Sequence, residues 1–234
     1  MAQQTITRPA WTPVPSKDRL AAGEERIPMS YEDYLEWQEG EFNLGEWVDG
    51  EVIVFEMPGL FHQRLGTWLT MLLELFAVRL SLGRAVGAEY EMKLDGVRSS
   101  RKPDIIFVAT EHVDRLTEPR LVGPADIAVE IVSPSSGPRD HRDKLVEYAV
   151  AGISEYWVID PRPLRRSVTV FHLNGEREYE PAQRRADGTL DSAVLADLRL
   201  PAAWLLDDPL PDLVDALGTL LDAVPSPTSS SEEE

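Results

Sequence analysis

An apolar segment of this chain is interrupted by a single acidic residue and reads Asp126-Ile127-Ala128-Val129-Glu130-Ile131-Val132. A second apolar segment, Ile105-Ile106-Phe107-Val108-Ala109, follows directly after Pro103-Asp104. Both segments are short, rich in β-branched residues and bounded by turn-forming residues, so they predict two buried β-strands. A carboxylate buried in such a strand costs on the order of several kcal/mol unless it has a partner. Two neighbouring strands that each carry a carboxylate can hold a hard metal ion such as Mg²⁺ between them.

The sequence supports a functional role for these two acidic residues to different degrees. Asp104 follows a proline at the entry of a strand, where aspartate is also common as a simple turn residue. Glu130 has apolar neighbours on both sides, and a buried glutamate is rarely left without a partner. Glu130 is therefore the stronger candidate for a functional residue. Asp104 becomes a better candidate because a second carboxylate is predicted on a neighbouring strand.

A lysine on the following helix could complete a site with these carboxylates. Residues 139–149 predict a helix that ends at Gly152. Asp140, Lys144 and Tyr148 recur at every fourth position and share one face of this helix. A lysine on a helix is usually a solvated charge. The two carboxylates are the reason to consider Lys144 a site residue instead. Lys102 is a competing candidate, but from its place beside Asp104 in the strand we expect it to point to the opposite face.

Pro103-Asp104 and Glu130-Ile131-Val132 together resemble the PD-(D/E)XK nuclease superfamily, in which aspartate and glutamate bind Mg²⁺ and a lysine completes the site. The superfamily's lysine position is occupied here by Val132. The chain is similar, more narrowly, to a large bacterial family of restriction endonuclease-like proteins, first catalogued as a domain of unknown function, in which the lysine has moved to the helix. This resemblance extends over roughly residues 28–205. The ordered motifs that carry it are Tyr31-Glu32-Asp33-Tyr34-Leu35, Glu46-Trp47-Val48-Asp49-Gly50-Glu51, His62-Gln63, Pro103-Asp104, Val129-Glu130-Ile131-Val132-Ser133-Pro134-Ser135, Arg139-Asp140 with Lys144, and Gly152-Ile153-Ser154-Glu155-Tyr156-Trp157-Val158-Ile159-Asp160-Pro161.

The resemblance implies both a fold and a set of site residues. The fold would be an α/β (α+β) restriction endonuclease-like core, with a mixed β-sheet flanked by helices. Asp104 and Glu130 would bind Mg²⁺, for which Mn²⁺ can substitute, and Lys144 would complete the catalytic site. Glu46 would face the metal, and His62 would be a further catalytic candidate; otherwise Glu46 is a solvated acid and His62 a capping or packing residue. The resemblance also implies that the protein pairs as a homodimer.

The distribution of charge is compatible with DNA binding although the formal net charge is −18. Residues 57–186, which hold most of the candidates, contain 18 acidic and 18 basic residues. The basic residues of this segment gather in three clusters, which are Arg98, Arg101 and Lys102; Arg139 and Arg142; and Arg162, Arg165 and Arg166. The first two clusters are adjacent in sequence to the proposed metal ligands, so Arg101, Lys102, Arg139 and Arg142 are the predicted DNA contacts. Such binding should be weak and sensitive to salt, and any single cluster could equally be solvated loop charge.

The remaining patterns predict the organisation of the chain. The predicted parts are a flexible N-terminal arm over residues 1–27, a nuclease-like domain over 28–205, a C-terminal helical extension over 206–224 and a disordered acidic tail over 225–234. Within the domain we expect a helix over 31–37, a hairpin over 46–55, a helix over 62–82, a strand over 84–94, and strands over 155–160 and 167–173. This order of helices and strands predicts a mixed sheet flanked by helices. The 62–82 helix has a second apolar stripe, Met71, Leu75 and Val78, which would contact a partner subunit or the C-terminal helix over 211–224. The chain has no cysteine and no segment apolar enough to span a membrane, and its first residues do not form a signal-peptide pattern, so a cytoplasmic location is expected.

The leading functional hypothesis is a Mg²⁺-dependent endonuclease that hydrolyses DNA phosphodiester bonds. In this hypothesis Asp104 and Glu130 hold the metal, Lys144 orients the attacking water or stabilises the transition state, and Arg101 and Arg139 contact phosphates. A nuclease-fold binding or scaffold protein with weak or no activity is the alternative. Hydrolysis of another phosphoester by the same residues is a third possibility.

Overall fold

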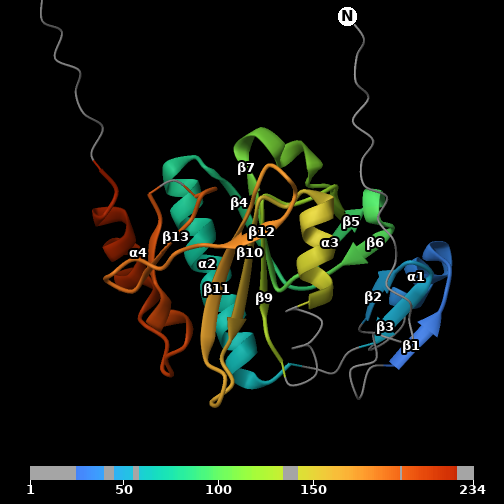
Figure 1. Cartoon of the computed structure of the whole chain (residues 1–234), viewed down its shortest axis with the longest axis horizontal. Coiled ribbons are helices and arrows are strands. Elements are labelled where there is room, and N and C mark those ends of the chain that lie inside the picture. Colours follow the sequence, from blue (N-terminus) through green and yellow to red (C-terminus); the bar gives the residue numbers. More distant parts are fainter. Residues whose placement is uncertain (1–24, 40–44, 55–57, 134–141, 196, 226–234) are drawn as a thin grey trace, which may run out of the picture.

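The structure is a computed structural model that describes residues 25–39, 45–54, 58–133, 142–195 and 197–225. Its central sheet has the strand order β12-β11-β10-β9-β7-β4. These strands are β4 (Gly83–Gly87), β7 (Ile105–Ala109), β9 (Ile127–Ile131), β10 (Glu155–Asp160), β11 (Ser167–Leu173) and β12 (Tyr179–Pro181). β9 and β10 pair in parallel and the other neighbours are antiparallel, so the sheet is mixed (Figure 1).

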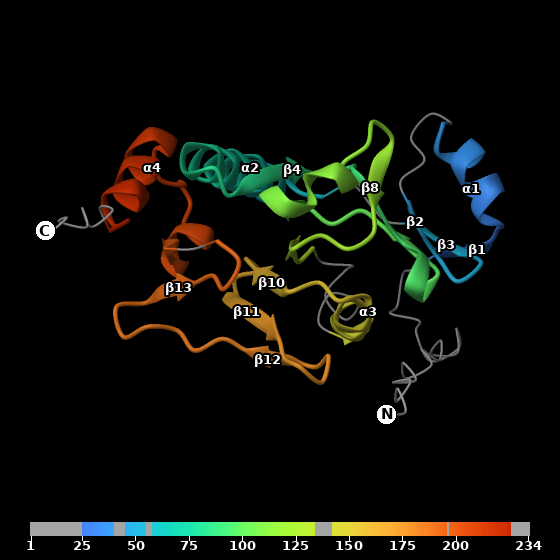
Figure 2. The same cartoon turned by 90° about the horizontal axis from the view of Figure 1, so that it is seen from above.

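Helices cover both faces of this sheet. The long helix α2 (Leu60–Leu80) and the C-terminal helix α4 (Leu213–Asp222) lie on one side, and α3 (Lys144–Ala151) lies on the other (Figure 2). Successive side chains of a strand point to opposite faces. Val129 and Ile131 therefore belong to the core on the α2 side, whereas Ala128 and Val132 belong to the core on the α3 side. Because β9 is covered on both faces, its sequence is a continuous apolar run rather than an alternating one.

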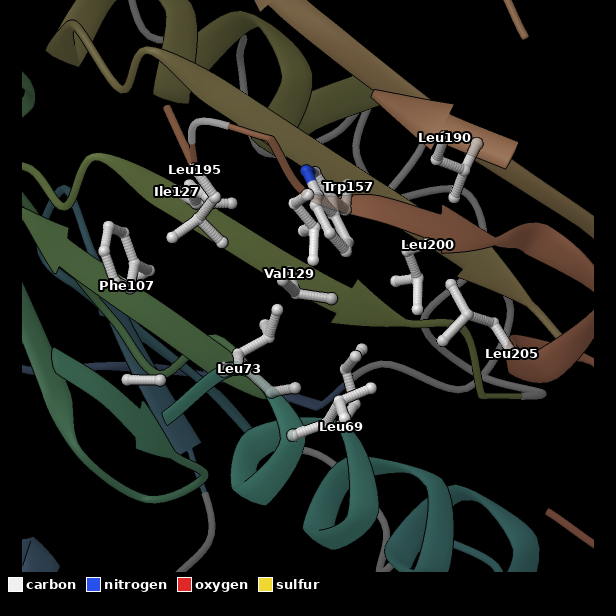
Figure 3. Packing of buried hydrophobic residues seen from close by; sticks show 14 of the residues in the cluster. Leu69, Leu73, Phe107, Ile127, Val129, Trp157, Leu190, Leu195, Leu200 and Leu205 are labelled. Atoms are coloured by element: carbon white, nitrogen blue, oxygen red, sulfur yellow. The ribbon is translucent and has the colours of Figure 1, made fainter. Parts of the chain in front are cut away.

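The core on the α2 side joins three parts of the chain (Figure 3). Leu69 and Leu73 of α2 point toward Phe107 and Val129 of the sheet, and Trp157 of β10 lies in the same layer. The C-terminal residues Leu190, Leu195, Leu200 and Leu205 pack against the same cluster. They come from the small sheet of β13 (Thr189–Asp191) and β14 (Arg199–Pro201), the segment between these strands, and the 3-10 helix η5 (Ala202–Leu205).

A second six-stranded sheet lies beside the first, with the order β1-β3-β2-β6-β5-β8. Its strands are β1 (Glu25–Pro28), β2 (Gly45–Val48), β3 (Glu51–Val54), β5 (Glu91–Leu94), β6 (Ser99–Arg101) and β8 (Arg120–Val122). The helix α1 (Tyr31–Gln38) packs on it, with Tyr34 buried together with Trp47 and Val52. Two further 3-10 helices are η2 (Asp95–Val97) and η3 (Thr110–Arg115).

Most of the elements expected from local patterns are confirmed. Ser30 caps α1 by accepting a hydrogen bond from the backbone N–H of Asp33, as its position before the helix predicts. The β2–β3 hairpin turns at Asp49 and Gly50, which both have positive φ, as expected for an Asp-Gly turn. α3 ends at Gly152, whose φ of 90° is the left-handed conformation favoured for a helix stop. β9 pairs in parallel with β10, and α3 connects them, so the three elements form a βαβ unit.

The expected mixed sheet flanked by helices is confirmed, and the strands form two large sheets of this protein. Two expectations about the bounds of elements are wrong. The strand expected over residues 84–94 is divided into β4 and β5, which join different sheets, and Glu89 between them has a φ of 69°. Residues 25–27, assigned to the arm, pair with β3 as part of β1. Residues 1–24, the start of the expected lysine helix at 139–141 and the tail over 226–234 lie outside the described residues, in which no helix is long and apolar enough to cross a membrane.

Candidate active site

A cavity of about 320 Å³ lies where the two large sheets and the first turns of α2 and α3 meet. All five residues predicted to be catalytic line it, from five different parts of the fold. They are Glu46 of β2, His62 of α2, Asp104 before β7, Glu130 of β9 and Lys144 of α3. The fold therefore brings together in one cavity residues that are almost 100 positions apart in the chain.

The two acidic residues predicted from the strands lie on neighbouring antiparallel strands. Ile105 of β7 pairs with Val129 of β9, and continuing this register by one residue sets Asp104 opposite Glu130. The Asp104 carboxylate accepts a hydrogen bond of 2.7 Å from the backbone N–H of Ile131 and lies 3.3 Å from Nε2 of His62. A backbone donor from the partner strand and a histidine from α2 thus hold this side chain in the cavity.

Lys144 points into the cavity as expected and is not a solvated helix charge. Its side chain is only 3% exposed, and Nζ lies 2.7 Å from Oε1 of Glu130 and 3.2 Å from Oε1 of Glu46. A buried lysine without a partner would be strongly disfavoured, and here the ammonium group faces two carboxylates. In return, Lys144 compensates the negative charge that Glu46 and Glu130 bring to the cavity.

Tyr148 is a further site residue. The sequence predicts that it shares a helix face with Lys144, but it was not among the predicted site residues. Its hydroxyl donates a 2.9 Å hydrogen bond to the same Oε1 of Glu130 that contacts Lys144. Burial, together with the charges of Glu130 and Glu46, raises the pKa of Tyr148 well above its usual value. Tyr148 therefore stays protonated and remains a donor. The spacing of four residues between Lys144 and Tyr148 was the available signal, since such residues are neighbours on a helix.

Arg101 has a different role from the one expected. It was predicted to contact DNA, but it is 1% exposed and sits between two buried carboxylates. Its guanidinium donates to Glu46 at 3.1 Å and, through two nitrogens, to Glu147 of α3, with Nε 2.9 Å from Oε1. Burial opposes the charge of Arg101, but Glu147 and Glu46 outweigh it and hold the pKa of the guanidinium well above its usual value. Arg101 is thus a positioning residue inside the protein and is not accessible to a phosphate.

Glu46 and Glu147 complete a continuous chain of buried charges. Glu46 contacts both Lys144 and Arg101, and it also accepts a 3.0 Å hydrogen bond from the backbone N–H of Lys102. Glu147 contacts Arg101 and accepts from Ser99. One helix, α3, therefore supplies Lys144, Glu147 and Tyr148, while the second sheet supplies Glu46 and Arg101. Glu147 was missed in the sequence because an acidic residue on a helix surface is usually solvated.

The remaining predicted DNA contacts differ in where the structure places them. Lys102 lines the same cavity as Asp104 and lies 3.4 Å from Glu89, so the expectation that it points to the opposite face is wrong. The reason is that Pro103 separates the two, and side chains two residues apart in an extended chain point the same way. Arg142 is exposed at the start of α3, 3.6 Å from Asp143, and Arg139 lies outside the described residues.

The donor set fits a hard divalent cation such as Mg²⁺. Among the described residues, no group of three or more His, Cys, Asp and Glu side chains forms a complete metal site. Mg²⁺ does not need one, since it keeps several waters and is commonly held by one or two carboxylates together with substrate phosphates. Asp104 and Glu130 provide two carboxylates of this kind in one cavity.

Comparisons with known proteins identify one matching family and a similar solved structure. The sequence profile of the family Uma2, described as "Putative restriction endonuclease", matches residues 31–203. Among solved structures, the chain is similar to a crystal structure of a "putative nuclease belonging to DUF820" from Anabaena variabilis, with a TM-score of 0.61 and 21% sequence identity. That similarity covers 76% of this chain and 98% of the other, and at this identity it is evidence for the fold alone. A search of curated proteins finds no match.

Proposed function

The chain belongs to the Uma2 family of restriction endonuclease-like proteins, and on that premise we propose that it is a Mg²⁺-dependent endonuclease acting on DNA. The observation that carries the proposal is the approach of Lys144 Nζ to within 2.7 Å of Glu130 in the cavity that also contains Asp104. Two carboxylates and a lysine on one cavity are the groups that phosphodiester hydrolysis needs. They hold a metal, and they supply positive charge where the transition state becomes more negative.

Each residue has a definite task in this proposal. Asp104 and Glu130 would hold the Mg²⁺, which when bound lowers the pKa of a water and stabilises charge on the scissile phosphate. Lys144 offsets the charge of Glu46 and Glu130, so a phosphate can enter a cavity that is otherwise acidic, and it donates to the phosphoryl group. Tyr148 fixes the orientation of Glu130 by donating to it. His62 contacts Asp104 at 3.3 Å and orients that carboxylate.

A binding or scaffold protein with weak or no activity is the second candidate, and one observation favours it. Oε1 of Glu130 contacts both Lys144 and Tyr148, and Lys144 also contacts Glu46. A cation of the protein itself, Lys144, thus compensates Glu46 and Glu130 in the position where a metal ion would do so. Hydrolysis of a different phosphoester remains the third candidate, because the same residues would support it.

The test is the conversion of supercoiled plasmid to nicked and linear forms with Mg²⁺ or Mn²⁺. We expect metal-dependent cleavage by the wild type and its loss in Glu130→Gln, which keeps the size of the side chain and removes its charge. The matched control is Glu111→Gln, which makes the same change at an exposed residue of η3. Equal cleavage by both variants would contradict the assignment of the site. A wild type that binds DNA but does not cleave it would favour the second candidate.

The same proposal includes the location and the oligomeric state of the protein. We propose a cytoplasmic protein that acts as a homodimer, in which two cavities could address the two strands of a duplex. The exposed stripe Met71, Leu75 and Val78 on α2 supports this pairing. The alternative expectation was that the C-terminal helix would cover this stripe. α4 does pack on α2, but it leaves these three residues exposed.

A further inference from the structure

The third basic cluster, Arg162, Arg165 and Arg166, is distant from the metal ligands in sequence but close to them in the structure. It forms the turn between β10 and β11. β9 and β10 are parallel neighbours, with Ile131 paired to Ile159, so they end at the same edge of the sheet. Figure 1 shows the β10–β11 turn at the same end of the molecule as the first turn of α2. The arginines are therefore held at the edge of the sheet where Glu130 lies.

A groove of about 810 Å³ connects this turn with the candidate active site. It is lined by Arg162 and Arg166, by Gly59 and Phe61 at the start of α2, and by the segment 206–209. His62 and Ser133 line both this groove and the active-site cavity. If one phosphate of a DNA strand lay in the cavity, the neighbouring nucleotides of that strand would therefore lie in the groove.

The chemistry of the turn suits a nucleic acid strand. Arg165 and Arg166 are exposed. Leu164 at the tip is 99% exposed, although a leucine normally gains about 1.5–3 kcal/mol by being buried. An exposed apolar side chain between arginines is the combination with which proteins contact bases while holding the neighbouring phosphates.

The groove is lined by two carboxylates, Asp207 and Asp208, and both are held loosely, whereas Asp160 is buried beside it. Asp160 contacts Arg162 through both oxygens, at 2.8 and 2.7 Å, so this arginine is fixed in place. Asp207 lies 3.8 Å from Arg166, and Asp208 lies 3.3 Å from Arg64, all four being about half-exposed or more. Exposed pairs of this kind contribute at most about 1 kcal/mol, so a phosphate can replace the carboxylates.

We propose that the groove between the β10–β11 turn and the segment 206–209 binds the DNA strand that flanks the scissile phosphate. Arg165 and Arg166 contact its phosphates, and Leu164 packs against a base. The proposal rests on the proposed function for its substrate, but it concerns binding, which is measured separately from cleavage.

The experiment is fluorescence anisotropy of a labelled DNA duplex with the Glu130→Gln protein, in which the proposed metal ligand is neutral and cleavage is not expected. In this background, Arg165→Ala with Arg166→Ala should weaken binding by tenfold or more and lower the slope of log K against log salt by about 0.9 for each phosphate that is no longer neutralised. The control, Arg79→Ala with Arg84→Ala, removes the same charge at the far end of α2 and in the adjacent β4. Arg79 lies about 25 Å from His62 along that helix, so this variant should change binding less than twofold.

Two further variants separate the contributions within the groove. Leu164→Ser should weaken binding without changing the salt slope, because it removes an apolar contact and no charge. Asp207→Asn with Asp208→Asn should strengthen binding, because Arg166 loses the competing carboxylate of Asp207 and the groove loses two negative charges.

The outcomes distinguish this inference from the proposed function. If the turn variants bind like the control while the wild type cleaves plasmid, the groove proposal is wrong and the nuclease proposal stands. If binding depends on the turn while the wild type does not cleave, the groove proposal stands and the catalytic one is wrong. If the Glu130→Gln protein binds no DNA at any salt concentration, the groove proposal is overturned.

Discussion

Replacing Arg101 by methionine tests whether the buried charge network positions the site. Arg101→Met keeps much of the apolar length of the side chain but removes the cation between Glu46 and Glu147, which are 2% and 3% exposed. Glu46 keeps its interaction with Lys144 at 3.2 Å, whereas Glu147 keeps the neutral hydroxyl of Ser99 as a donor and no longer has the guanidinium. Breaking a buried pair by removing one partner typically costs about 3–5 kcal/mol. For a chain of this size, that corresponds to a fall in the melting temperature of roughly 6–20 °C.

The assay is urea-induced unfolding followed by tryptophan fluorescence, with Arg142→Met as the control. Arg142 is exposed, so the same substitution there should change the free energy of unfolding by no more than about 0.5 kcal/mol. The double variant Arg101→Met with Glu147→Met removes both charges, and we expect it to recover much of the stability, because a buried pair replaced by apolar side chains is often neutral. A single variant as stable as the control, or a double variant whose destabilisation equals the sum of its two single variants, would refute the reasoning.

Three other predictions concern metal, pH and assembly. Mg²⁺ should raise the melting temperature of the wild type by mass action, and Asp104→Asn with Glu130→Gln should abolish that increment; an equal shift in both would place the metal elsewhere. Burial raises the pKa of Tyr148 above its usual value of 10.0, so the unfolded state loses this proton first and stability falls above about pH 10 by up to about 1.4 kcal/mol per pH unit; Tyr148→Phe should show a shallower fall in urea titrations, and an unchanged slope would contradict the assignment. Light scattering should find a dimer of the full-length protein that Met71→Lys with Leu75→Lys converts to a monomer, and a monomeric wild type would show that the exposed stripe is not an interface.

The elements that local patterns predicted best are those whose signals are contained in a few neighbouring residues. The β10 and β11 strands appear with the expected bounds, 155–160 and 167–173. Ser30 begins a helix and Gly152 ends one, because caps depend on one side chain and one backbone conformation. The position of Glu130 inside an apolar strand was likewise visible, since an acid in that context needs a partner wherever the strand is placed.

The sequence did not show which residues the charged side chains contact, or which strands pair with one another. Arg101 looked like an accessible basic residue because it lies in a short basic cluster, but its neighbours in space are Glu46 and Glu147, each more than 40 positions away. The β4–β5 segment looked like one strand, because nothing local shows that its two halves pair with different sheets.

What the sequence alone established is that strands carry Asp104 and Glu130 and that a helix presents Lys144 on the same face as Tyr148. These follow from the periodicities of strand and helix, which act over a few residues. Only the tertiary structure determined which charges meet: that Lys144 lies between Glu46 and Glu130, that Arg101 is buried, and that the β10–β11 turn shares a groove with His62. The physical reason is that burial and pairing of charge depend on how distant segments pack, and no short stretch of chain contains that information.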